Sequence, residues 1–246
     1  MPVRTPWPSR LGLLAMTEPD SSADPFDEPA YREAIIDLLG GLAYGELTAF
    51  SRLAGDAELA PTLEGKASLA RVAVTEFGHY ERIEARLREL GVDPRCAMEP
   101  FVAPFDAFHN RTAPKTWLEG LVKAFVGDGI ASDFYREISA FVDPGTRELM
   151  LSVLDDMGHD DFVVDAVLAA TKADPSVSGR LALWGRRLVG EALSQAQQVA
   201  AERDALVTLL VGGGAFPGAD LAELARMFAR ITDEHSSRMQ RLGLTP

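Results

Sequence analysis

Apolar residues recur at intervals of three and four along nearly the whole chain, and this spacing constrains the fold more than any other feature. It is the period of an α-helix that buries one face. Stretches in which apolar and polar residues alternate, as in a half-buried strand, are almost absent. The sequence therefore predicts an all-α protein. Six helices are expected, over residues 28–54, 62–91, 114–141, 145–172, 175–210 and 218–242.

The connections between these helices predict how they pack. Short turns join the first helix to the second and the third to the fourth, so each pair is expected to form an antiparallel hairpin. A longer link, residues 92–113, lies between the hairpins and contains Pro94, Pro100 and Pro104. A helix of about 28 residues is about 42 Å long, whereas about 22 extended residues span up to about 73 Å. The link can therefore cross the bundle, and two hairpins joined by one crossover form the ferritin-like four-helix bundle.

The domain organisation follows from these elements. We expect one ferritin-like helical domain over residues 28–243, in which the last two helices are additions to the four-helix bundle. Residues 16–27 are acidic and polar and offer little to bury. We therefore expect residues 1–27 to be a disordered N-terminal tail.

Composition limits the classes of function. No apolar run approaches the roughly 18 residues needed to cross a membrane, so no membrane association is expected. The formal net charge of −13 disfavours stable nucleic-acid binding, because phosphate contacts need clustered Lys and Arg. Cys96 is the only cysteine. It excludes an intrachain disulfide and a cysteine-rich metal site, and it fits a cytoplasmic protein.

An acidic side chain interrupts the apolar face of each of the first four expected helices near mid-length. On the second and fourth helices, a histidine follows the acid after three residues. Residues three apart share a helix face, so a carboxylate and an imidazole at this spacing can bind one metal ion. The six candidate metal ligands are Glu46, Glu76, His79, Asp128, Asp156 and His159.

These ligands form an internal repeat. Thirty residues separate Glu46 from Glu76, and 28 separate Asp128 from Asp156. Four carboxylates and two histidines that face a bundle core suit two divalent metal ions. The two ions would also balance carboxylates that are costly to bury alone. The alternative is that the carboxylates pair with arginines or face water and that the histidines are ordinary core residues.

Other side chains offer alternatives near these positions. Asp133 and Glu137 lie to one side of Asp128 on the same expected helix, and either could replace it as a ligand. Tyr135 is expected close to the site, as a core residue beside the ligands rather than a redox group, although it could also support or replace a ligand. Glu191 follows a glycine, as the predicted acidic ligands Glu46 and Asp128 do. It is expected to support the site or to pair with the nearby Arg186 or Arg187.

The ligand pattern resembles that of the ferritin-like di-iron tRNA 2-methylthio-isopentenyl-adenosine hydroxylases, and above all that of their shorter actinobacterial relatives. The family pattern is Glu, Glu-x-x-His, Glu, Glu-x-x-His. Here Glu46 and Glu76-x-x-His79 match the first half, whereas Asp128 and Asp156 replace the glutamates of the second half. The resemblance implies two divalent metal ions, with iron favoured over manganese, and hydroxylation of an unactivated carbon. Because aspartate is one methylene shorter, the second half departs from the family most.

The expected function is therefore that of a di-metal oxidoreductase that activates dioxygen or peroxide. Its substrate would be a small molecule or a modified nucleoside, and a homodimer is compatible with the sequence. Two rival functions stay open at this point. One is a non-enzymatic ferritin-like protein that binds metal or a partner, and the other is a tRNA hydroxylase that acts on isopentenyl-adenosine.

Overall fold

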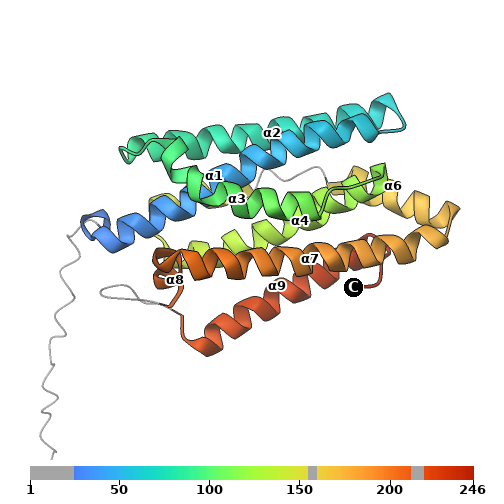
Figure 1. Cartoon of the computed structure of the whole chain (residues 1–246). Coiled ribbons are helices and arrows are strands. Elements are labelled where there is room, and N and C mark those ends of the chain that lie inside the picture. Colours follow the sequence, from blue (N-terminus) through green and yellow to red (C-terminus); the bar gives the residue numbers. More distant parts are fainter. Residues whose placement is uncertain (1–24, 155–159, 212–218) are drawn as a thin grey trace, which may run out of the picture.

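The computed structural model describes residues 25–154, 160–211 and 219–246, and its regular structure in these ranges is entirely helical (Figure 1). The prediction of an all-α protein is confirmed. Short 3-10 turns are η1 (Pro25–Asp27), η2 (Ala57–Leu59) and η3 (Ser139–Phe141). The α-helices are α1 (Pro29–Asp56), α2 (Leu63–Glu89), α3 (Pro94–Arg111), α4 (Trp117–Ile138), α5 (Pro144–Leu154), α6 (Asp160–Ala173), α7 (Ser176–Glu202), α8 (Asp204–Val211) and α9 (Leu221–Arg241).

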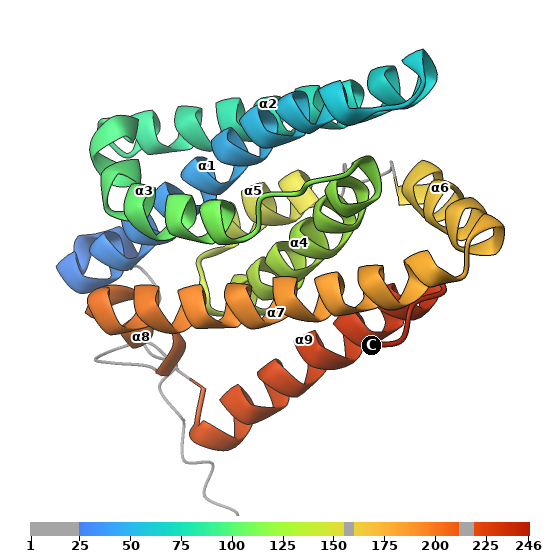
Figure 2. The ribbon, with the colours of Figure 1, turned by 45° about the vertical axis from the view of Figure 1, so that its right-hand side comes forward.

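Helices α1 and α2 form the predicted hairpin and lie side by side in both views (Figures 1 and 2). Pro29 occupies the first turn of α1, where its missing N–H costs no helical hydrogen bond. The hydroxyl of Thr62 accepts a hydrogen bond from the backbone N–H of Gly65 and caps α2. These local signals explain why both helices begin one residue from their predicted starts.

The connection between the hairpins differs from the prediction. Residues 94–111 form helix α3, so the link between the hairpins is helical rather than extended. The side chain of Asp93 caps the helix, and Pro94 occupies its first turn. Pro100 and Pro104 lie inside α3, and each removes one backbone hydrogen bond. Packing of α3 against α1 offsets this loss, because the missing side chain of Gly40 leaves room for the backbone of Ala97.

The third, fourth and fifth predicted helices are each divided in the structure. The third corresponds to α4 followed by η3, and the fourth to α5 and α6, between which residues 155–159 lie outside the described part. The fifth is divided into α7 and α8 at Arg203. Arg203 forms an ion pair with the buried Asp37 of α1. The sixth predicted helix is α9, which packs against α4 and α7.

Two clusters of buried apolar side chains form the core. One cluster includes Ile35 and Leu39 of α1 and Ile83 of α2. The other includes Leu69 of α2 and Leu121 of α4, together with parts of α6, α7 and α9. Both clusters draw on α1 and α2, so the middle of this hairpin lies where they meet.

The segment that precedes α1 is helical from residue 25. Residues 25–27, the last of the segment predicted to be disordered, form η1, and the ring of Phe26 packs edge-on against Tyr31 at 5.6 Å. Residues 1–24 lie outside the described part. None of the helices in the described ranges is both long and apolar enough to cross a membrane.

Candidate metal centre

Three of the six predicted ligands meet in the middle of the α1–α2 hairpin. Glu46 comes from α1, and Glu76 and His79 come from α2. Each offers one ligand atom, and these atoms lie within 4.8 Å of one another. Nδ1 of His79 is 3.5 Å from Oε2 of Glu46 and 3.6 Å from Oε2 of Glu76. The structure therefore brings the first half of the predicted site together.

The helical sequence explains this geometry. The three-residue spacing places Glu76 and His79 one turn apart on the same face of α2. That face also carries the buried Ala73 and Ile83, so the two polar residues are carried into the core with it. His79 is 1% exposed and Glu76 is 3% exposed, whereas the side chain of Glu46 retains 13%. The cluster is a buried site with one edge toward solvent.

Burial changes the protonation of this cluster. It raises the pKa of Glu76, and the neighbouring Glu46 carboxyl raises this pKa further. Burial by itself would lower the pKa of His79, but hydrogen bonding and attraction to Glu46 and Glu76 outweigh it and raise this pKa to about 9. Without a metal ion, the cluster therefore holds protons at neutral pH in order to reduce buried charge.

The residues present fit a divalent metal ion. Nitrogen and carboxylate ligands lie about 2.0–2.2 Å from such an ion, so two ligands of one ion are about 3 to 4 Å apart. The two contacts of His79, at 3.5 and 3.6 Å, lie within this range. Two carboxylates and one imidazole form a donor set that iron and manganese both accept. A bound cation would also replace the protons that the cluster otherwise holds.

An open groove lies on the surface of α2 beside His79. It is lined by Thr75, Gly78, His79 and Arg82 of α2 and has a volume of about 450 Å³. The side chain of Arg82 also donates a hydrogen bond to the backbone carbonyl of Ser152, at 3.2 Å, and so links α2 to α5. The groove therefore borders one of the candidate ligands.

The second half of the predicted site is only partly described. Asp128 is half-buried on α4 and does not belong to the Glu46–Glu76–His79 group among the described residues. Asp156 and His159 lie outside the described residues. Metal binding by these three residues stays a prediction.

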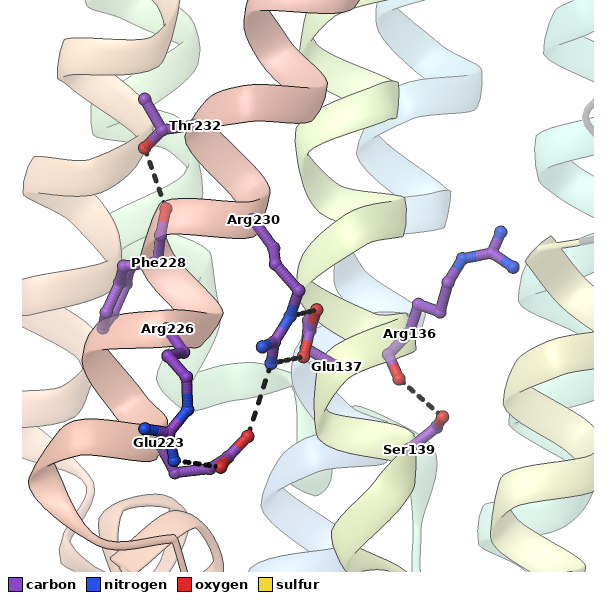
Figure 3. Close-up of polar contacts among 8 residues, drawn as sticks. All are labelled: Arg136, Glu137, Ser139, Glu223, Arg226, Phe228, Arg230 and Thr232. Atoms are coloured by element: carbon purple, nitrogen blue, oxygen red, sulfur yellow. Dashed lines mark hydrogen bonds and ion pairs between the residues drawn. The ribbon is translucent and has the colours of Figure 1, made fainter.

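The carboxylates considered as alternative ligands are held by arginines. Asp133 forms an ion pair with Arg238 of α9. Glu137 forms two hydrogen bonds of 2.7 Å with Arg230 and points from α4 toward α9 (Figure 3). These contacts fasten α9 to α4, and they engage both carboxylate oxygens of Glu137 and one of Asp133.

Glu191 also differs from its predicted role. It accepts a 2.6 Å hydrogen bond from Nε of Arg111, at the end of α3. The prediction of Arg186 or Arg187 as its partner was wrong. Arg186 donates instead to the backbone carbonyls of the last two residues, and Arg187 donates to the backbone carbonyl of Arg111. Glu191 thus fastens α7 to α3.

Tyr135 lies beside the candidate ligands. Its hydroxyl is 3.8 Å from the position that a Cβ atom would take on Gly45, next to Glu46. Burial raises the pKa of Tyr135, and the charge of Glu46 raises it further. The phenol therefore stays protonated next to the Glu46 segment.

Phe105 was missed as a site neighbour, because its segment was predicted to be a link. Its ring lies 3.3 Å from the position of a Cβ on Gly45 and packs edge-on against Tyr44 at 5.8 Å. Phe101, Phe105 and Phe108 follow one another at helical spacing. This aromatic spacing is the signal that could have revealed a helix covering α1.

Comparisons with known proteins agree with this architecture. The model of the family described as "Ferritin-like domain, actinomycetes" matches residues 29–213. Among solved structures, one similar chain is "Protein 19 with aldehyde deformylating oxidase activity" from Synechococcus, with a TM-score of 0.68 and 20% sequence identity. The match covers 90% of this chain and 94% of the other. No match was found among curated proteins.

Proposed function

The chain belongs to the ferritin-like domain family of actinomycetes, and from this premise we propose that it is a metal-dependent oxidoreductase that activates dioxygen or peroxide. One observation carries the proposal. Glu46, Glu76 and His79 form a buried group whose ligand atoms lie within 4.8 Å of one another. A buried group of two acids and a histidine is costly for a protein that makes no use of it. A bound divalent cation offsets that cost.

Within this proposal, the residues have separate tasks. Glu46, Glu76 and His79 hold the first metal ion, and Asp128, Asp156 and His159 hold the second. Bound iron supplies the electrons for the activation of dioxygen or peroxide. Because Asp128 and Asp156 are one methylene shorter than glutamate, we expect the second ion to be held more weakly than the first.

The surroundings of the first site serve the same chemistry. Phe77, which follows Glu76 in sequence, packs against Phe50 of α1 with the ring centroids 5.1 Å apart. Together with Phe105, which lies against Gly45, these rings add apolar surface near the ligand-bearing segments of α1 and α2. The phenol of Tyr135 keeps its proton beside Glu46, where it can orient the carboxylate or supply a proton.

We also propose that the substrate is a small organic molecule. The groove of about 450 Å³ beside His79 has the size of a small-molecule site. The formal net charge of −13 opposes the binding of a whole tRNA. The aldehyde deformylating oxidase activity named for the similar structure supports an oxidation on this fold, and we extend it to this chain as a class of chemistry alone.

Metal analysis tests the proposal. The full chain is expressed in iron-supplemented medium, and its metal content is measured by mass spectrometry beside that of the Glu76→Gln and Glu84→Gln variants. Glu84 pairs with Arg88 on the same helix and serves as the matched control. We expect at least one equivalent of iron or manganese in the wild type and the control and a large loss in Glu76→Gln. Less than about half an equivalent in the wild type contradicts the metal site.

A second measurement separates an enzyme from a protein that only binds metal. The metal-loaded chain is mixed with a chemical reductant, and oxygen consumption is followed with an electrode. We expect consumption by the wild type that exceeds the rate with an equal amount of free metal ion. A fully loaded protein that consumes no oxygen and no peroxide supports the non-enzymatic alternative.

A further inference from the structure

The outer face of α2 carries an apolar stripe that the described chain leaves exposed. Leu63 is 86% exposed and Val74 is 68% exposed, and Ala67 and Ala70 between them are also exposed. Their spacing of four, three and four residues is that of a coiled-coil seam. Helix α2 lies at the edge of the molecule in two views that differ by a turn of 45° (Figures 1 and 2).

Charged residues beside the stripe indicate what covers it. Glu64 and Arg71 lie on the same side of the seam, and both are exposed. Seven residues of helix place them about 10.5 Å apart along the axis, which is too far for them to pair within one α2. An antiparallel second copy of α2 places each of them opposite its complement, because residues at this heptad position face one another in antiparallel helix pairs.

We propose that the chain forms a symmetric homodimer through antiparallel packing of α2 on the α2 of a second copy. Leu63 then lies opposite the partner's Val74, and Ala67 lies opposite the partner's Ala70. Glu64 meets the partner's Arg71, and two-fold symmetry repeats this ion pair on the other side of the axis. The small alanines at the centre let the two helices approach closely.

The charges also select the antiparallel orientation. In a parallel pair, Lys66 would lie next to the partner's Arg71, and like charges at these positions oppose pairing. Lys66 already forms a 2.8 Å ion pair with Glu58 of its own chain, on the far side of the seam from Glu64. The antiparallel arrangement leaves that pair intact.

The size of the seam sets the strength of the dimer. The stripe from residue 63 to residue 74 is about 17 Å long at 1.5 Å per residue. A contact of this length is smaller than a standard stable interface. We therefore expect reversible association with a dissociation constant in the micromolar range.

Sedimentation equilibrium of the full chain tests the surface. We compare the wild type with Val74→Glu and with Leu183→Glu, whose leucine is 64% exposed on α7 and serves as the control. Val74→Glu is expected to raise the dissociation constant at least about tenfold, because it buries a charge in the seam. Leu183→Glu is expected to leave it unchanged. Circular dichroism checks that both variants are folded.

Charge reversal tests the orientation. Glu64→Arg and Arg71→Glu each place like charges opposite one another, so each variant alone is expected to dimerise more weakly than the wild type. The double variant restores both pairs and is expected to recover the wild-type dissociation constant. A mixture of the two single variants is expected to form a heterodimer, because each supplies the charges that the other needs.

Several outcomes would overturn the proposal. A wild-type chain that stays monomeric up to about 200 μM contradicts it, since this concentration exceeds a micromolar dissociation constant. So does a dimer that Val74→Glu leaves unchanged. A dimer that Val74→Glu disrupts, but that the charge reversals do not affect, rejects the antiparallel register. Because no metal ligand is changed, these results are independent of metal content.

Discussion

Nδ1 of His79 on α2 lies 3.5 Å from Oε2 of Glu46 on α1. This contact joins two helices and, with Glu76, closes a cluster of three ionisable groups inside an apolar hairpin. Such a cluster lowers the stability of the metal-free protein, because each group loses hydration. The metal-bound protein should therefore be more stable than the metal-free protein, and ligand variants should lose this difference.

Metal binding should raise the temperature at which the protein unfolds. Mn²⁺ at about 100 times its dissociation constant should stabilise the wild type by about 2.7 kcal/mol. His79→Ala should lose most of this effect, whereas the control variant Glu84→Gln should keep it. Scanning calorimetry under anaerobic conditions measures all three. An equal rise of the melting temperature in His79→Ala would show that the ion binds elsewhere.

The affinity for metal should rise with pH. Burial, together with Glu46, raises the pKa of Glu76. The carboxylates outweigh burial at His79 and raise its pKa to about 9. Both groups must lose their protons when a metal ion binds. Affinity should therefore increase from about pH 6 to pH 9, and calorimetry in buffers of different ionisation enthalpy should detect proton release. A pH-independent affinity contradicts this account.

The metal-free protein should respond to pH in the opposite direction. The folded-state pKa values of Glu76 and His79 lie above their ordinary values, so the folded state binds more protons than the unfolded state. The stability that these groups contribute is present at low pH and is lost as the pH rises through the folded-state pKa values. The free energy of unfolding of the wild type, measured by urea denaturation relative to that of Glu76→Gln, should therefore fall as the pH rises.

Gly40 should be intolerant of a side chain. A Cβ atom at this position of α1 would collide with the backbone carbonyl of Ala97 on α3. Gly40→Ala should destabilise the fold by about 2 kcal/mol, because the two backbones must move apart. Gly190→Ala on α7 is the control, since a Cβ there meets no atom within 4 Å. It should stabilise the protein by up to about 1 kcal/mol. Equal effects in urea denaturation would contradict the close packing of α1 and α3.

The ion pair between Arg203 and Asp37 should be important for stability. Asp37 is 4% exposed and accepts two hydrogen bonds from the guanidinium. Arg203→Ala leaves this carboxylate buried without its partner and should cost about 2 kcal/mol, less than a fully buried pair because Arg203 is 29% exposed. Arg226→Ala removes an exposed pair with Glu223 and should change stability much less, because solvent screens an exposed ion pair. Urea denaturation compares the two.

Local signals explain which parts of the fold could be predicted. Pro29 and Thr62 mark the starts of α1 and α2 through chemistry within one turn. Helix α3 was missed because Pro100 and Pro104 predict a break, and its packing against Gly40 of α1 is a tertiary effect. The division between α7 and α8 at Arg203 carries no proline or glycine signal. It coincides with an ion pair to Asp37, which is distant in sequence.

The same contrast holds for the candidate site. Glu76 and His79 lie on the same face of α2 because they are three residues apart. Glu46 joins them because α1 and α2 form a hairpin, and the short turn between the two helices predicts this hairpin. The partners of Asp133 and Glu191 are Arg238 and Arg111. No spacing rule identifies these arginines, because they come from helices whose packing the sequence pattern does not specify.

Anomalous scattering at the iron absorption edge tests the central claim most directly. A crystal of the full chain grown after anaerobic loading with Fe²⁺ would be measured on both sides of the edge. We predict a strong anomalous peak within about 2.2 Å of ligand atoms of Glu46, Glu76 and His79. A map of the iron-loaded crystal with no peak at this cluster, while the three side chains are well ordered, would contradict the assignment of a metal site.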